Sequence, residues 1–89
     1  MALVSGTFSG TGSSAAIRGR AIDIAMNFAG TASVDVERRM YDGDWIKIAT
    51  AITADYNYVA EYPSPVDLRL TCTAYTDAVE YVLQTGPED

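Results

Sequence analysis

The side chains of this chain that could do chemistry are few, and carboxylates dominate them. Asp42 and Asp44 flank Gly43, while Asp35 and Glu37 are spaced to share one face of an extended strand. Two carboxylates placed across a cleft can hydrolyse a glycosidic bond, but a chain of 89 residues offers little room for such a cleft. We therefore interpret Asp42 and Asp44 as turn-forming residues. Asp35 and Glu37 are expected to form a solvated strand face.

The remaining reactive groups predict no catalytic residue, no metal site and no cofactor. Histidine, the usual general base at neutral pH, is absent from the sequence. Cys72 is the single cysteine, which excludes an internal disulfide and leaves too few ligands for a structural zinc site. It lies between Leu70 and Ala74 in an alternating stretch, so we expect it to be buried and inert. The acidic residues lack the repeated spacing of a calcium loop.

Composition narrows the class of protein further. The hydrophobic fraction of 48% is that of a globular domain. Twelve acidic residues against six basic ones give a formal net charge of −6, which argues against nucleic-acid binding. The N-terminal sequence has no basic segment followed by an apolar run, and no stretch is long enough to span a bilayer. We expect synthesis in the cytoplasm and no membrane association.

The clearest structural signal is the Asp42-Gly43 step. It separates two stretches, 32–37 and 45–49, that alternate between apolar and polar residues. Asp-Gly supplies the positive φ angles of a tight turn, and the alternation supplies two antiparallel strands. Trp45 is out of phase with Ile46 and Ile48 in this hairpin, so it faces outward if those isoleucines belong to the core.

Further alternating segments predict an all-β fold. We expect strands at 21–29, 55–62, 67–75 and 78–85, with Pro63 and Pro65 breaking the ladder between the middle two. One-sided alternation requires a second apolar layer. The expectation is an antiparallel β-sandwich, immunoglobulin- or fibronectin-like, with six strands, or seven if residues 3–20 pair. The expected organisation is a Gly/Ser/Thr-rich arm or edge strand at 1–14, a sandwich domain at 15–85 and an acidic tail at 86–89.

Exposed aromatic and apolar residues are the best candidates for a partner interface, because they combine a large apolar area with a polar handle. Packing of the tyrosines in the core and of the tryptophan under a loop are the alternatives. The N-terminal arm is a further candidate, because a flexible segment can add a strand to a neighbour's sheet. The candidate interface residues are Leu3, Val4, Phe8, Trp45, Tyr56, Tyr58 and Tyr62.

The order of several short motifs is distinctive. They are a Gly/Ser/Thr-rich start with Phe8, the strand end 28–31, the stretch 34–38 leading into 42–45, Tyr62-Pro63, and the strand 68–76. Over residues 7–84 this order resembles a group of small structural proteins of tailed bacteriophages and prophages. The strand 68–76 is also similar to the penultimate strand of fibronectin-type domains. The phage resemblance implies a virion component without catalytic residues.

Three functions follow as hypotheses. The first is a capsid decoration or cement protein, located in the virion and bound to a major capsid or tail protein, in which many weak contacts add together in a homo-oligomer or lattice. The second is a carbohydrate- or receptor-binding module of a tail or fibre, with Trp45 and the tyrosines as its platform. The third, a small hydrolase, depends on the carboxylates alone.

Overall fold

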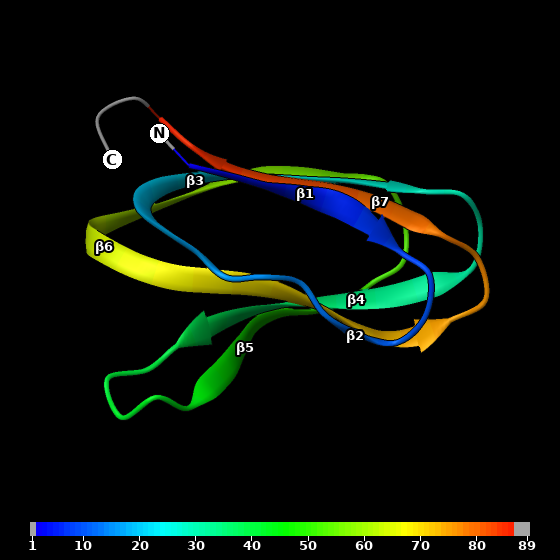
Figure 1. The fold of residues 1–89 in the computed structure, drawn as a ribbon, viewed down its shortest axis with the longest axis horizontal. Helices are drawn as coiled ribbons and strands as arrows, with labels where there is room; N and C mark the ends of the chain where they lie inside the picture. Colours follow the sequence, from blue (N-terminus) through cyan, green and yellow to red (C-terminus); the bar gives the residue numbers. More distant parts are fainter. Residues whose placement is uncertain (1, 87–89) are drawn as a thin grey trace.

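The chain forms one antiparallel sheet, shown in Figure 1 as a computed structural model that describes residues 2–86. Its strand order is β1-β7-β3-β6-β4-β5, and β2 also pairs with β6. The all-β, antiparallel part of the prediction is confirmed. The strands are β1 (Leu3–Phe8), β2 (Gly12–Ser13), β3 (Ile17–Phe28), β4 (Ala32–Arg39), β5 (Trp45–Ile52), β6 (Tyr56–Tyr75) and β7 (Val79–Thr85).

The sheet folds over on itself because β6 is long enough to belong to both of its halves. The first part of β6 pairs with β3, from Tyr56 to Glu61, and the second part pairs with β4, from Leu68 to Tyr75. Figure 1 shows β6 curving from one layer into the other at one end of the molecule. The chain of β6 therefore connects the two halves through the bend, and the two halves share one core.

The bend is built where the sequence predicts a break. Pairing with β3 jumps from Ala21 opposite Glu61 to Gly19 opposite Val66, which leaves residues 62–65 without ladder partners. Pro63 and Pro65 lie in this gap, where the missing backbone N–H costs no ladder bond. The ladder is thus interrupted as expected, but β6 stays extended through the prolines, and the prediction of two separate strands is wrong.

The core confirms most of the predicted alternation. The apolar positions of β3, β7 and the second half of β6 face inward, and Cys72 lies among them as predicted. Ala74 was expected to continue this face but is exposed, because it lies near the end of β6. The buried cluster consists of Phe8, Ile17, Ile22, Ile24, Met26, Ala32, Val34, Val36, Ala60, Val66, Leu68, Leu70, Cys72, Val79 and Leu83.

The N-terminal residues belong to the sheet. Strand β1 pairs with β7 along its whole length, from Leu3 opposite Gln84 to Phe8 opposite Val79. The Phe8 side chain is only 6% exposed, and its ring centroid lies 4.7 Å from that of Tyr81. This segment was expected to be either a flexible arm or an edge strand, and in the structure β1 is an edge strand. Most of the expected acidic tail, residues 87–89, lies outside the described residues.

Strands β4 and β5 form the predicted hairpin. Arg39 is paired with Trp45, so the connection is the five residues 40–44, longer than a two-residue turn. Gly43 has a φ of 98°, a conformation that favours glycine. The Asp42 carboxylate accepts a hydrogen bond from the backbone N–H of Asp44 at 3.0 Å. This supports the interpretation of Asp42 as a turn-forming residue.

Candidate contact surfaces

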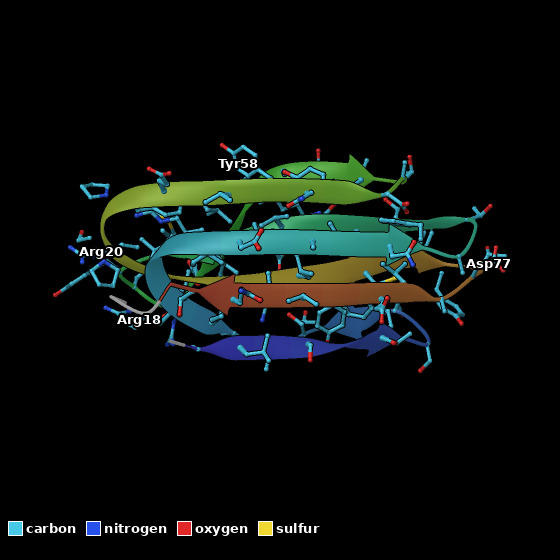
Figure 2. All side chains as sticks on the ribbon, turned by 90° about the horizontal axis from the view of Figure 1, so that it is seen from above. Arg18, Arg20, Tyr58 and Asp77 are labelled. Carbon is cyan, nitrogen blue, oxygen red and sulfur yellow. The ribbon has the colours of Figure 1, made fainter. Side chains whose placement is uncertain are left out.

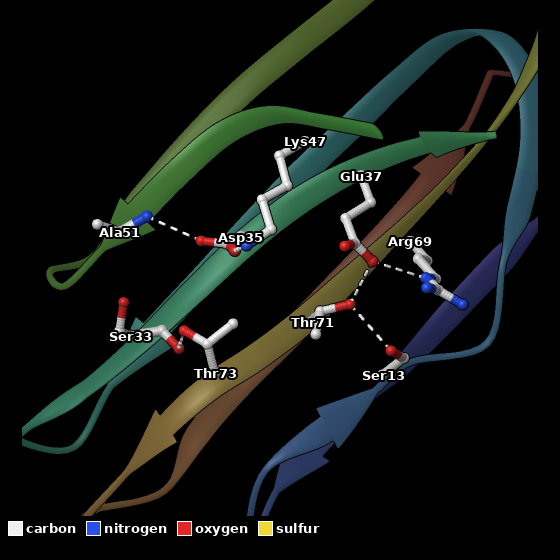
Figure 3. A network of polar contacts seen from close by, with 9 residues as sticks. All are labelled: Ser13, Ser33, Asp35, Glu37, Lys47, Ala51, Arg69, Thr71 and Thr73. Carbon is white, nitrogen blue, oxygen red and sulfur yellow. Dashed lines mark hydrogen bonds and ion pairs between the residues drawn. The ribbon is translucent and has the colours of Figure 1, made fainter. Parts of the chain in front are cut away.

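The face of β4 that was expected to be solvated is buried. Asp35 is 3% exposed and Glu37 is 8% exposed. Figure 3 shows Lys47 and Ala51 of β5 beside Asp35, and Arg69 and Thr71 of β6 beside Glu37. The prediction of a solvated acidic strand face is therefore wrong, because β4 lies inside the sheet and its neighbours contribute long side chains that reach across it.

Glu37 is the centre of a polar network. Its Oε1 accepts hydrogen bonds from Arg69 Nε at 2.8 Å and from Thr71 Oγ1 at 2.6 Å. Thr71 Oγ1 also lies 2.9 Å from Ser13 Oγ, which ties β2 to the network. Burial alone would raise the pKa of the Glu37 carboxyl, but these hydrogen bonds and the Arg69 charge outweigh it and lower the pKa below its usual value. The carboxylate is held ionised, as a structural group.

Asp35 has a second structural role, at an irregularity in β5. Its Oδ1 accepts a hydrogen bond from the backbone N–H of Ala51 at 2.9 Å, and its Oδ2 lies 3.1 Å from Lys47 Nζ. Ala51 has a φ of 54°, at the point where the β4–β5 register shifts. Asp35 therefore stabilises a bulge whose backbone is unfavourable for alanine. None of these contacts leaves a carboxylate free for hydrolysis.

Trp45 faces outward as predicted, but it is only half-exposed. The Arg69 guanidinium lies 4.3 Å from the centroid of its ring, so the indole packs under a neighbouring side chain. Ile46 and Ile48 alternate with it and point to the inner side, yet they are 44% and 42% exposed. They are not core residues, because β5 is the last strand of its half of the sheet, and among the described residues no strand pairs with its other side.

A groove opens between β5 and the first part of β6, where the two halves of the sheet separate. This tyrosine groove has a volume of about 320 Å³. It brings together three of the predicted interface residues, Tyr56, Tyr58 and Tyr62. Burial, with a smaller contribution from Tyr58, raises the pKa of the Tyr56 hydroxyl. The groove is lined by Ile24, Val36, Ile48, Ala49, Tyr56, Tyr58, Ala60, Glu61 and Tyr62.

The other predicted interface residues do not join this groove. Leu3 is exposed at the sheet edge and Val4 is half-buried against the core. Phe8 is a core residue, and Trp45 lies on the outer face of β5. The seven predicted residues thus fall on separate parts of the molecule.

A group of exposed apolar residues on the hairpin was mostly missed by the sequence prediction of an interface. Met40 and Tyr41, in the β4–β5 turn, are exposed, and so are the side chains of Ile46 and Ile48 on the adjoining strand. We call these four residues the hairpin patch. Figure 1 shows the hairpin diverging from the other layer of the sheet, with its turn at the lower left. The sequence did contain a signal for this patch: two large apolar residues, Met40 and Tyr41, come directly before the predicted Asp-Gly turn. Turns are usually polar, so apolar residues there indicate a contact surface.

The cysteine and the possible metal ligands can be placed within residues 2–86. Cys72 is buried, and that burial raises the pKa of its thiol. Among the described residues no three His, Cys, Asp or Glu side chains gather as metal ligands. The same part of the chain contains no helix with the length and apolarity needed to cross a lipid bilayer.

The class of fold is therefore an antiparallel sheet bent over a single core. In this respect the chain is similar to the crystal structure of Yersinia pseudotuberculosis-derived mitogen (YPM), with a TM-score of 0.52 and 14% sequence identity, over 99% of this chain and 87% of that one. At this identity the likeness concerns the fold alone. No protein family and no curated protein matches the sequence.

Proposed function

We propose that this chain is a non-catalytic β-sandwich module that works by protein–protein contact, as a decoration subunit of a bacteriophage virion. The observation that carries the contact role is the hairpin patch, in which Met40, Tyr41, Ile46 and Ile48 are exposed on one projecting hairpin. Exposed apolar side chains gathered in this way are typical of interaction surfaces. The virion location and the immunoglobulin- or fibronectin-like form of the sandwich stay predictions from the sequence.

The edge position of β5 supports the same role. Its inner neighbour is β4, and among the described residues no strand pairs with its other side. A free edge with isoleucines beside it can receive a strand or a side chain of a partner. Lys47, between the two isoleucines, gives the edge a charge that discourages unspecific aggregation. The hairpin patch has only four residues, so a single contact through it would be weak. In a lattice, the weak contacts of many copies add together.

The N-terminal segment is not part of this proposal. Strand β1 already pairs with β7, and deleting residues 2–14 would remove Phe8 from the core together with β2. Such a deletion would test folding, and a loss of binding would not identify a clasp.

The test is occupancy on purified capsids of the phage that carries the gene. We expect the full-length Tyr41→Ser/Ile46→Thr variant to fold, as judged by circular dichroism, and to lose at least about tenfold in capsid affinity. Tyr75→Ser is the matched control, because Tyr75 is exposed at the far end of β6, and its affinity should be unchanged. Native affinity in the hairpin variant, or no binding of the native chain, would overturn the proposal.

Carbohydrate binding is a second candidate, favoured by the tyrosine groove. Its volume of about 320 Å³ suits one or two sugar rings, and Tyr58 presents an exposed ring with Glu61 as a hydrogen-bond acceptor nearby. A glycan array with the native chain tests this function. Tyr58→Ala should abolish any signal while Trp45→Ala should keep it, because Trp45 lies outside the groove. Binding that survives Tyr58→Ala, or an array without signal, would exclude a sugar site in the groove.

A further inference from the structure

A second cavity lies on the other side of the β4–β5 turn. It has a volume of about 390 Å³ and is formed where three segments meet at the bent end of the molecule: the start of β3, the end of β4 and the proline bend of β6. Figure 2 places Arg18 at this end, opposite the end that carries Asp77. The residues lining this arginine cavity are Arg18, Arg38, Arg39, Met40, Tyr41, Pro65, Val66 and Asp67.

The cavity gathers positive charge in an acidic protein. Three of the six basic residues of the chain line it, although the net charge is −6. Arg18 is neutralised by Asp67, with Nη1 3.2 Å from Oδ1. Within residues 2–86 neither Arg38 nor Arg39 forms an ion pair. Two guanidinium groups thus border the cavity without a carboxylate partner.

Arg38 carries the stronger signal. Its Nε is buried and has no hydrogen-bond partner among the described residues. Its guanidinium carbon lies 4.9 Å from the centroid of the Tyr62 ring, which fixes the plane of the group. A buried donor without a partner costs free energy. The same side chain lines the cavity, and a planar guanidinium can bind two oxygens of an anion side by side.

The rest of the lining indicates what kind of anion fits. Met40 and Tyr41 belong to both the cavity and the hairpin patch, and Pro65 and Val66 add apolar surface on the opposite wall. A ligand held here must place a negative group next to apolar groups. An Asp or Glu side chain within an apolar protein segment has this combination. A polyphosphate does not, because it has no apolar part to place against these side chains.

We propose that the arginine cavity binds a carboxylate side chain of the partner protein, with Arg38 and Arg39 as its two ligands. This deepens the proposed contact function and rests on it: the hairpin patch contacts the apolar residues of a partner segment, and the cavity receives an acidic residue next to them. The charge gives the contact its specificity.

The test is an NMR titration of the ¹⁵N-labelled full-length chain, which requires no capsid. The probe is the peptide acetyl-Leu-Glu-Leu-Glu-amide, and its control is the same peptide with Gln in place of Glu. We expect the Glu peptide to shift the Arg38 Nε–Hε resonance and the Gln peptide to leave it unchanged. Arg38→Gln and Arg39→Gln should each weaken binding at least about tenfold.

Three results would overturn the carboxylate site: equal binding of the two peptides, native affinity in Arg39→Gln, or inorganic phosphate that shifts the same resonance at a lower concentration than the Glu peptide. Arg39 is exposed, so its variant keeps the test valid if Arg38→Gln does not fold. If the peptide binds but the native chain does not occupy capsids, the cavity stands as a carboxylate site and the decoration role fails.

Discussion

Glu37 and Arg69 are direct partners across the β4–β6 ladder, and their ion pair lies on the outer face of the sheet with both side chains largely covered. The carboxylate Oε1 is 2.8 Å from Arg69 Nε, and the same guanidinium lies over the Trp45 ring. One arginine therefore joins three strands, because Trp45 belongs to β5. This pair is also the one that the sequence pattern placed in solvent.

Loss of Arg69 should destabilise the fold. The Arg69→Ala variant leaves a carboxylate that is nearly buried without its charged donor, so we expect the free energy of unfolding to fall by about 2 kcal/mol. Urea denaturation followed by tryptophan fluorescence measures this. Arg18→Ala is the control: the Arg18–Asp67 pair is exposed, with 65% of the arginine side chain accessible, and should contribute no more than about 0.5 kcal/mol. Equal effects of the two variants would contradict the structural role of Glu37.

The lowered pKa of Glu37 makes stability depend on pH in the acid range. A carboxyl whose pKa is lower in the folded than in the unfolded state stabilises the fold above its unfolded value, about 4.3 for Glu. That contribution is lost as the pH falls through the folded pKa. We expect the free energy of unfolding to drop below about pH 5, and to drop less steeply in Glu37→Gln. Parallel pH profiles for the two proteins would show that Glu37 is not the group responsible.

The pattern of alternating residues predicted which side chains share a face, but it could not predict which faces are covered. Ile22, Ile24 and Leu70 were placed in the core correctly, since their strands lie in the middle of the sheet. Ile48 points to the same side, yet it is exposed because its strand is at the edge. Whether a strand is central or at an edge depends on pairing between segments far apart in the chain, which local alternation does not contain.

The candidate site was predictable to a similar extent. The tyrosine stripe of β6 was recognised from its spacing, and it lines one groove. The arginine cavity was not, because Arg18 and Arg38 are brought together only by the pairing of β3 and β4 on either side of β6, opposite Asp67 and Leu68. The prolines were recognised as an interruption. The sequence did not show that β6 bends at the prolines and continues into the other layer. This bend coincides with the register shift of β3 at Arg20.

The thiol of Cys72 should be unreactive in the folded protein. It is 1% exposed, and burial raises its pKa above the usual value, so the reactive thiolate is scarce at neutral pH. We expect a disulfide reagent such as dithionitrobenzoate to react at least about a hundredfold more slowly with the native chain than with the chain in denaturant. A rapid reaction under native conditions would mean that the core around β6 opens readily.

The bulge at Ala51 offers a substitution that should stabilise the protein. With a φ of 54°, Ala51 has a conformation that costs an alanine about 1 kcal/mol and costs a glycine almost nothing. Ala51→Gly keeps the backbone N–H that donates to Asp35, so the hydrogen bond at 2.9 Å is retained. The greater flexibility of glycine in the unfolded chain offsets part of the gain. We therefore expect an increase in the free energy of unfolding of up to about 1 kcal/mol, measured by urea denaturation.

The matched control is Ala49→Gly, in the same strand but without a positive φ. This substitution should lower the free energy of unfolding. If both substitutions destabilise the chain equally, the backbone of Ala51 carries no strain that glycine relieves.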